Sequence, residues 1–452
     1  MRSLLLALER VASGLVTGRV RRLLRPLVRR RRDVALEPWS QPLTASGVAP
    51  SWPTASIRQP TTSPALSARS GERCLLITDS LDTGGVDEVV AFLARELPAY
   101  GFEIAILIAS DGPSKGIGLI GRQLGAEGVT VVDPGAIDGP AWVAEWHPDV
   151  MYLHGGMQWP VDVANGLGVP AAVVLHGMHD LFPVDGPELA ARARKLAAVV
   201  AVSELVREEF LAKSAELGGT QTLVIPNGVD PAKVSRFDRA QARQNLGLQD
   251  EVLFVSLARH CLQKNSYALV TAFDDVAARL PNAHLLVCGR VDEVIYTRQV
   301  VGAAERSRFS SRIHLRDNTE RTDMVLGAAD VFVLDSFFEG WSLASMEALA
   351  SGVPSVLSDV GGAREQLATG LPSGRLISNP LGDPVGLTWD AMLKARFGRQ
   401  ENHDELVEAM VAVAGGAGLG SRDEIAEASL ARFSASRAVR AHAELLTRLA
   451  SA

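Results

Sequence analysis

Short apolar runs alternate with helix-forming stretches from residue 72 onward, and this alternation leaves the chain few possible folds. Each run has three to five residues, is rich in Val, Ile, Leu and Ala, and shows no regular polar alternation, which is typical of parallel strands buried on both faces. The runs are 74–78, 104–108, 129–132, 150–153, 171–175 and 199–202 in a first series, and 252–256, 284–288, 313–315, 331–334 and 355–357 in a second. We therefore expect an α/β fold with two doubly wound parallel-sheet domains.

The stretch between the two series is rich in turn-forming residues. Residues 224–230 contain Pro-Asn-Gly followed by an aspartate, which suits a hinge between domains. We place the first domain at 72–235 and the second at 236–432. Ligands of doubly wound sheets bind beyond the carboxyl ends of the strands, so the functional site is expected in a cleft where these edges face each other.

A basic segment precedes the domains. Residues 1–71 contain 12 Arg, no Lys and three acidic residues, a net charge of +9 against −7 for the whole chain. Apolar residues recur at helical spacing within residues 1–32, which predicts an amphipathic helix whose apolar face could lie on an anionic membrane surface. The same pattern also fits a helix that packs on the body of the protein or on a partner, or an arm without fixed structure.

The segment from 33 to 71 predicts a flexible linker. It holds 17 Pro, Ser or Thr among 39 residues and few apolar clusters, so it is not expected to contribute to a core.

Composition and spacing exclude several classes of protein. No apolar stretch reaches the roughly 18 residues of a membrane span. Cys74, Cys261 and Cys288 show neither paired nor metal-ligand spacing, which favours a reduced, cytoplasmic setting. If residues 1–32 bind lipid, the protein would sit peripherally on the cytoplasmic membrane face. The body without its arm is acidic, which argues against nucleic acid as a partner.

One run in the second domain combines an anion site with two carboxylates. Residues 339–354 begin Glu-Gly-Trp-Ser-Leu and continue as an Ala- and Leu-rich helix that should start near Ser342. The backbone N–H groups of such a start, here near Ser342 and Leu343, bind anions such as phosphate. Glu339 and Glu347 flank it, and carboxylates pair with hydroxyl groups. A ligand offering phosphates and vicinal hydroxyls is a nucleotide sugar, although two solvated surface charges are the simpler alternative.

The whole run resembles the Glu-x7-Glu motif of the retaining glycosyltransferases of family 4, in which Glu-Gly-aromatic opens the loop and Glu-Ala-x-Ala-x-Gly-x-Pro closes the helix. The resemblance covers about residues 72–370 and resumes at 433–449. It implies the GT-B fold, two facing Rossmann-like domains across a cleft, with a final helix at 433–452 that crosses back to the first domain. Trp341 stands where Phe is usual and Ser342 where Gly is frequent, which leaves the donor sugar open.

Further residues of the second domain match the family. Arg259 and Lys264 follow a strand end at the spacing of the family's Arg-x4-Lys clamp, and these two cations suit a diphosphate. Ala258 departs from the Gly that usually precedes the Arg. Gly289 resembles the strand-end glycine beneath the nucleotide, and Leu315 occupies the place where backbone groups contact the base.

Residues of the first domain match the family less specifically. Gly84 and Gly85 resemble its Gly-Gly loop, which closes over the sugar diphosphate and the acceptor. His176 corresponds to its strand-end histidine near the sugar and the acceptor. His179 and His154 are weaker candidates for that role.

The resemblance implies a metal-independent retaining glycosyltransferase that needs no cofactor. Arg259 and Lys264 would stabilise the leaving diphosphate, Glu339 would hold sugar hydroxyls and Glu347 the ribose hydroxyls. The acceptor would attack from the same face that the diphosphate leaves. The expected partners are a nucleotide-sugar donor and a glycan or lipid-linked acceptor.

Two other functions remain open at this point, a nucleotide-sugar epimerase on the same fold and a non-catalytic nucleotide-sugar-binding scaffold. Residues 371–415, with Trp389 among them, are less typical of the family and have no assigned role.

Overall fold

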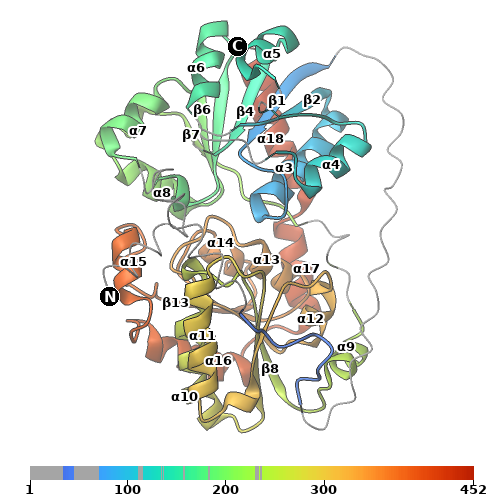
Figure 1. Ribbon diagram of the computed structural model, residues 1–452, viewed down its shortest axis with the longest axis vertical. Helices are drawn as coiled ribbons and strands as arrows, with labels where there is room; N and C mark the ends of the chain where they lie inside the picture. The colour runs from blue at the N-terminus through green and yellow to red at the C-terminus, as the bar shows by residue number, and fades with distance from the viewer. Residues whose placement is uncertain are drawn as a thin grey trace.

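A computed structural model describes residues 34–44 and 71–451, apart from 110–115, 134, 136, 156–157, 182–183, 230–233 and 235–236. Two α/β domains stand one above the other along the longest axis of the molecule (Figure 1). Each is built on one parallel sheet flanked by helices, so the expected pair of facing Rossmann-like domains is confirmed.

The first domain has a seven-stranded sheet in the order β3-β2-β1-β4-β5-β6-β7. Its strands are β1 (Glu72–Thr78), β2 (Phe102–Ile108), β3 (Thr130–Val132), β4 (Val150–His154), β5 (Ala171–Leu175), β6 (Ala198–Ala201) and β7 (Thr222–Val224). Its helices are α3 (Gly85–Glu96), α4 (Leu119–Ala126), α5 (Gly139–Trp146), α6 (Trp159–Leu167), α7 (Gly186–Ala193) and α8 (Glu204–Ala212). The order reverses beside β1, which pairs with β2 on one side and β4 on the other, so the carboxyl ends of β1 and β4 border the site.

The second domain has a six-stranded sheet in the order β10-β9-β8-β11-β12-β13. Its strands are β8 (Val252–Leu257), β9 (Ala283–Cys288), β10 (Ile313–Arg316), β11 (Val331–Leu334), β12 (Ser355–Ser358) and β13 (Gly374–Ile377). Its helices are α9 (Arg239–Leu246), α10 (Ser266–Arg279), α11 (Val294–Arg306), α12 (Thr322–Ala328), α13 (Leu343–Ala350), α14 (Ala363–Leu367), α15 (Trp389–Ala395), α16 (His403–Ala414) and α17 (Arg422–Arg432).

Each of the eleven apolar runs singled out in the sequence coincides with one of these strands, to within two residues at its ends. β7 and β13 were not among the expected strands, and each lies at one of the two edges of its sheet. Both are short and only partly buried, so their sequences lack the continuous apolar character of a central strand.

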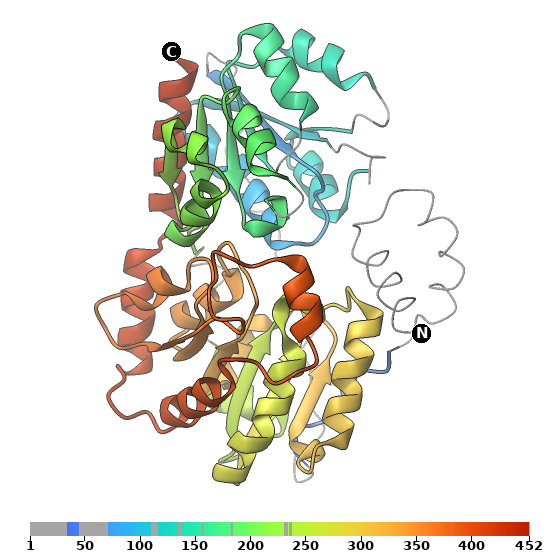
Figure 2. The same ribbon diagram turned by 90° about the vertical axis from the view of Figure 1, so that its left-hand side faces the viewer.

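The chain returns to the first domain through its last helix, α18 (Ala435–Ala450). Figure 2 shows α18 along the side of the first domain, although α17 before it belongs to the second. Val229 donates its N–H to the Phe433 carbonyl at 2.7 Å, and Ala435 donates back to Val229 at 3.1 Å. The two crossings between the domains are therefore hydrogen-bonded side by side.

Residues 34–44 depart from the expected linker, and we call them the strap. They lie along β10, an edge strand of the second sheet, and appear as the dark blue segment across the second domain in Figure 1. Leu43 is buried, and Leu36 and Trp39 pack against the cores of that domain. The composition of 33–71 as a whole hid these three apolar residues, which an edge strand with free backbone groups can hold.

No helix within the described parts of the chain is long and apolar enough to cross a membrane. Residues 1–32, for which a membrane-surface helix is expected, lie outside those parts.

The packing of α18 generates a stability prediction. Leu446 is fully buried in the first-domain core, so Leu446→Ala should lower the free energy of unfolding of that domain by about 2–5 kcal/mol, because it leaves a cavity. Chemical denaturation followed by tryptophan fluorescence measures the change. Leu376→Ala on β13 is the matched control, since Leu376 is 40% exposed and should change stability by less than about 0.5 kcal/mol. Equal effects would contradict the docking of α18.

Candidate active site

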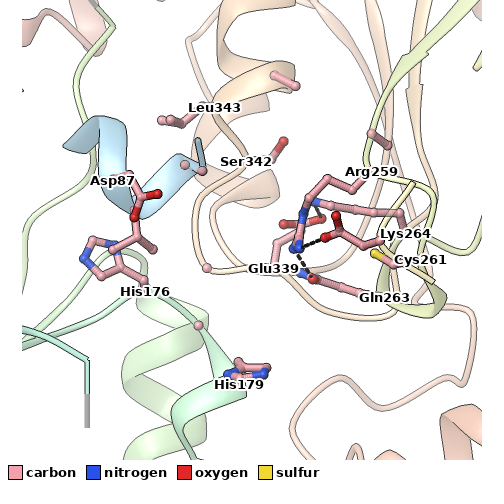
Figure 3. Close-up of a pocket in the computed structure, with 18 of the residues that line it drawn as sticks. Asp87, His176, His179, Arg259, Cys261, Gln263, Lys264, Glu339, Ser342 and Leu343 are labelled. Carbon is pink, nitrogen blue, oxygen red and sulfur yellow. Dashed lines mark hydrogen bonds and ion pairs between the residues drawn. The ribbon is translucent and has the colours of Figure 1, made fainter. Parts of the chain in front are cut away.

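A cleft of about 1210 Å³ lies between the two domains. Residues beyond the carboxyl ends of β1, β4 and β5 line one wall, and residues beyond β8, β9 and β10 line the other, together with the start of α13. In Figure 3, Asp87, His176 and His179 come from the first domain, whereas Arg259, Lys264 and Glu339 gather on the opposite side. The cleft is where the topology of two doubly wound sheets places a ligand site.

The start of α13 faces this cleft. Ser342 is its N-cap, with its hydroxyl accepting a hydrogen bond from the Ser345 N–H at 3.3 Å. Ser342, Leu343 and Ala344 all line the cleft. The first N–H groups of a helix have no intrahelical partner and carry the positive end of its dipole, so α13 presents an anion site here.

Lys264 and Glu339 form an ion pair at the base of the cleft. Lys264 Nζ lies 2.5 Å from Glu339 Oε1, and the Ser336 hydroxyl donates to the same oxygen at 2.6 Å. Both side chains are largely buried, with 13% and 8% of their surface exposed. A buried ion pair of this kind holds its two side chains in one geometry, because separating them would leave an uncompensated charge.

Arg259 is held by residues that the sequence analysis did not select. Its guanidinium contacts the Asp292 carboxylate at 2.6 Å and the Gln263 side-chain oxygen at 3.1 Å. Arg290 binds the other oxygen of Asp292 at 2.7 Å. Burial would raise the pKa of Asp292, but the hydrogen bonds from Arg290 and Arg259 and their charges outweigh it, and the pKa is lowered. The position of Arg290 and Asp292 just after Gly289 was the available signal.

Arg290 also reaches across the cleft. Its guanidinium donates to the Thr83 hydroxyl at 2.8 Å, directly before Gly84 and Gly85, which both line the cleft at the start of α3. The Gly-Gly loop is thus tied to the second domain beside the Arg259 site.

The two domains meet closely at Gly340. A Cβ atom at Gly340 would overlap the His176 carbonyl oxygen of the first domain. Only glycine allows this approach, which explains the glycine after Glu339 in the central run.

His176 lies on the first-domain wall and is paired with His154. His154 Nδ1 and His176 Nε2 are 2.9 Å apart, and their rings stack with centroids 5.2 Å apart. Burial lowers the pKa of His176 to about 4 and holds that of His154 well below its usual 6.5. Both imidazoles are therefore neutral at pH 7. From the sequence, His154 and His176 are alternatives for one role, whereas the structure joins them in one hydrogen bond. His179 also lines the cleft.

A second buried pair lies behind these histidines. The Tyr152 hydroxyl is 2.7 Å from Nδ1 of His442 on α18, and the Tyr152 ring contacts that of His154. Burial lowers the pKa of His442 to about 3.

Three of the expected binding residues, Trp341, Glu347 and Leu315, present little or none of their side chains to the cleft. Trp341 lines the cleft but is largely buried, packing on Phe433 and donating its indole N–H to Met346 sulfur. Glu347 lies one turn beyond Leu343 on α13, half-buried, and is not among the residues that line the cleft. Leu315 points into the core of the second domain, and its carbonyl accepts a hydrogen bond from Glu37.

Gly289, by contrast, lines the cleft as expected. A Cβ atom there would overlap the Ala258 carbonyl, so the loops after β8 and β9 can touch only because residue 289 is glycine. Among the residues with described positions, no group of three or more His, Cys, Asp or Glu side chains is arranged to hold a metal ion.

Comparison with known proteins agrees with this geometry. The family model of Glycosyltransferase Family 4 matches residues 83–233, and that of Glycosyl transferases group 1 matches residues 238–384. Together the two models match more than half of the chain, one on each domain. The chain therefore belongs to the group 1, family 4 glycosyltransferases, and it is a glycosyltransferase with a GT-B fold.

Individual relatives share less than a third of their aligned residues with this chain. Phosphatidyl-myo-inositol mannosyltransferase of Mycolicibacterium smegmatis is 28% identical over 325 residues, 67% of this chain and 79% of that protein. D-inositol 3-phosphate glycosyltransferase of Geodermatophilus obscurus is 26% identical over 372 residues, 71% of this chain and 79% of its own. Among solved structures, Anabaena Alr3699/HepE in complex with UDP and glucose matches with a TM-score of 0.61 and 18% identity, covering 83% of this chain and 99% of that one.

The buried histidines predict that stability falls in acid. The folded-state pKa values of His176 and His442 lie below 6.5, so the unfolded chain binds more protons at low pH. The contribution of these two histidines to stability should be full above about pH 6.5 and decline as the pH falls toward 4. His442→Gln keeps an acceptor for Tyr152 and removes one titrating group, so its Tm should drop less between pH 7 and 5. Thermal denaturation across this range measures the difference, and parallel curves for the two proteins would contradict it.

Proposed function

We propose that the protein is a retaining, metal-independent glycosyltransferase that transfers a sugar from a nucleoside-diphosphate sugar to a glycan or lipid-linked acceptor. The observation that carries this proposal is the convergence of Lys264, Arg259 and the start of α13 on one cleft, beside the carboxylate of Glu339. Cations and helix N–H groups suit a diphosphate, and the carboxylate suits sugar hydroxyls.

The donor is proposed to bind on the second-domain wall. Lys264 and Arg259 are each paired with a carboxylate, so a diphosphate would compete with Glu339 and Asp292 for them. As the bond between the sugar and the diphosphate breaks, these cations and the start of α13 would stabilise the negative charge on the leaving group. They supply the charge compensation for which other enzymes use a divalent cation, which supports metal independence.

Retention follows if the acceptor attacks from the face that the diphosphate leaves. The acceptor hydroxyl oxygen would form the new bond to the sugar, and its proton would pass to an oxygen of the departing phosphate. His176 is neutral at pH 7 and bound to His154, so we assign it to hydrogen bonding with the sugar or the acceptor.

The acceptor is proposed to bind between the first-domain wall and α15. His179, Glu188 and Arg192 line the cleft on one side, and Trp389, the first residue of α15, lines it on the other. Figure 1 shows α15 at the edge of the second domain facing α7. An aromatic face and polar groups around it suit a carbohydrate or polyol. Two relatives act, by their names, on inositol phosphate and phosphatidyl-inositol acceptors, so we include such polyols.

The basic segment at residues 1–32 is proposed to attach the enzyme peripherally to an anionic, cytoplasmic membrane surface. Its 10 arginines and apolar helical spacing support this, and it would bring the cleft close to a lipid-linked acceptor.

A nucleotide screen tests the donor class. The full chain should be stabilised against heat by one of UDP, GDP or ADP, and EDTA should leave the shift unchanged. UDP is the first candidate, because the structurally similar Alr3699/HepE was solved with UDP and glucose. A shift that EDTA abolishes would overturn metal independence. Absence of a shift with any nucleotide or its sugar conjugates would favour a non-catalytic scaffold.

Substitution of Lys264 tests the clamp. Lys264→Ala should lower the transfer rate at least about 100-fold, since it removes a charge that stabilises the leaving group. The rate is measured as release of the nucleoside diphosphate in the presence of acceptor. Arg279→Ala is the matched control, because Arg279 is exposed, pairs with Glu408 and lies away from the cleft. Transfer at the wild-type rate by folded Lys264→Ala would refute the clamp.

A further inference from the structure

The strap, residues 34–44, is bound to the edge of the second sheet through its backbone. Glu37 donates its N–H to the Leu315 carbonyl at 2.9 Å and pairs with Arg316 as a parallel bridge. The indole N–H of Trp39 donates to the Asp317 carbonyl at 3.1 Å. The strap therefore binds the edge strand β10 through one bridge and follows the chain to the point where β10 ends at the cleft.

The strap also covers one arginine completely. Arg316 is 0% exposed, its guanidinium lies 5.0 Å from the Trp39 ring centroid, and its Nη2 donates to the Gln41 carbonyl at 2.8 Å. The Nε atom of Arg316 lies 3.7 Å from the Glu37 carboxylate. The same carboxylate forms a hydrogen bond with His314 Nδ1 at 3.0 Å. Since a buried charge is costly without partners, Arg316 depends on the strap for its position.

Arg316 in turn holds the loops of the diphosphate clamp. Its carbonyl accepts the N–H of Gly289 at 3.2 Å and lies 2.9 Å from His260 Nε2. A carbonyl can only accept, so His260 carries its proton on Nε2. His260 directly follows Arg259, and its own N–H donates to the Arg290 carbonyl at 2.8 Å.

The chain beyond Arg316 reaches the cleft itself. Asn318 and Thr319 line it, one and two residues past the Asp317 carbonyl that Trp39 holds. The contacts of the strap thus end at two groups of donor-side residues, the clamp loops and the loop after β10.

We propose that Glu37 and Trp39 are positioning residues of the donor site, which fix the clamp loops through Arg316. The proposal rests on the proposed function of Arg259 as a diphosphate ligand. It gives the segment before the first domain a role in the second, and it accounts for the burial of an arginine at the edge of a sheet.

The other half of the strap supplies a matched control. Leu43 is 2% exposed, donates its N–H to the Leu246 carbonyl at the end of α9 at 2.8 Å, and packs in a core on that side. Leu43→Ala should therefore loosen only this end of the strap, since the contacts of Glu37, Trp39 and Gln41 with β10 are kept. Trp39→Ala removes both the indole hydrogen bond and the contact with Arg316.

Amide hydrogen exchange of the full chain without ligand tests the positioning directly. In Trp39→Ala, the N–H groups of His260 and Gly289 should exchange at least about tenfold faster than in the wild type, because the loops open locally. In Leu43→Ala they should exchange at the wild-type rate. Unchanged exchange in Trp39→Ala, or equal acceleration in both variants, would overturn the proposal. Glu37→Gln serves as a second variant if Trp39→Ala folds poorly.

Nucleotide binding separates this inference from the proposed function. With the nucleoside diphosphate that stabilises the wild type, Trp39→Ala should raise Kd at least about fivefold and Leu43→Ala should leave it unchanged. Wild-type affinity in Trp39→Ala would overturn the positioning role while leaving the proposed function intact. If no nucleotide binds the wild type, the proposed function fails, and the exchange measurement still decides whether the strap fixes these loops.

Discussion

The ion pair between Lys264 and Glu339 is the interaction on which the site depends. The two groups come from loops after β8 and β11, and they are held together out of water at the point where those loops face the first domain. Glu339 is followed by Gly340, whose backbone touches the His176 carbonyl. Because the pair and the glycine are adjacent, the same few residues fix the position of Lys264 and set the distance between the domains.

Charge in the cleft is arranged in pairs that a ligand can rearrange. Arg259 and Arg290 share Asp292, and Arg290 also binds Thr83 beside the Gly-Gly loop. A diphosphate that engages Arg259 would weaken its bond to Asp292, which would alter the contact between the domains. The strap contacts Arg316, whose carbonyl accepts the Gly289 N–H, and we propose that it supports these loops.

Much of the fold could be predicted because its strands are buried on both faces. A central parallel strand is apolar along its whole length, so runs such as 252–256 and 331–334 can be recognised in the sequence. The edge strands β7 and β13 were not predicted, since both are short and only partly buried. The strap was not predicted for a different reason. Its three apolar residues are few among the Pro, Ser and Thr of residues 33–71, and they become buried only by packing against the second domain beside β10.

The sequence by itself determined the two α/β domains and the residue types of the cleft, since Arg259, Lys264, Glu339 and Ser342 stand just past strand ends or at a helix start, where backbone topology must bring them together. Only the tertiary structure decided which groups pair. In the structure His154 is hydrogen-bonded to His176, Arg259 pairs with Asp292, and the Leu315 side chain packs in the core. Such pairings depend on contacts between segments far apart in the chain, and no local pattern encodes the distance between them.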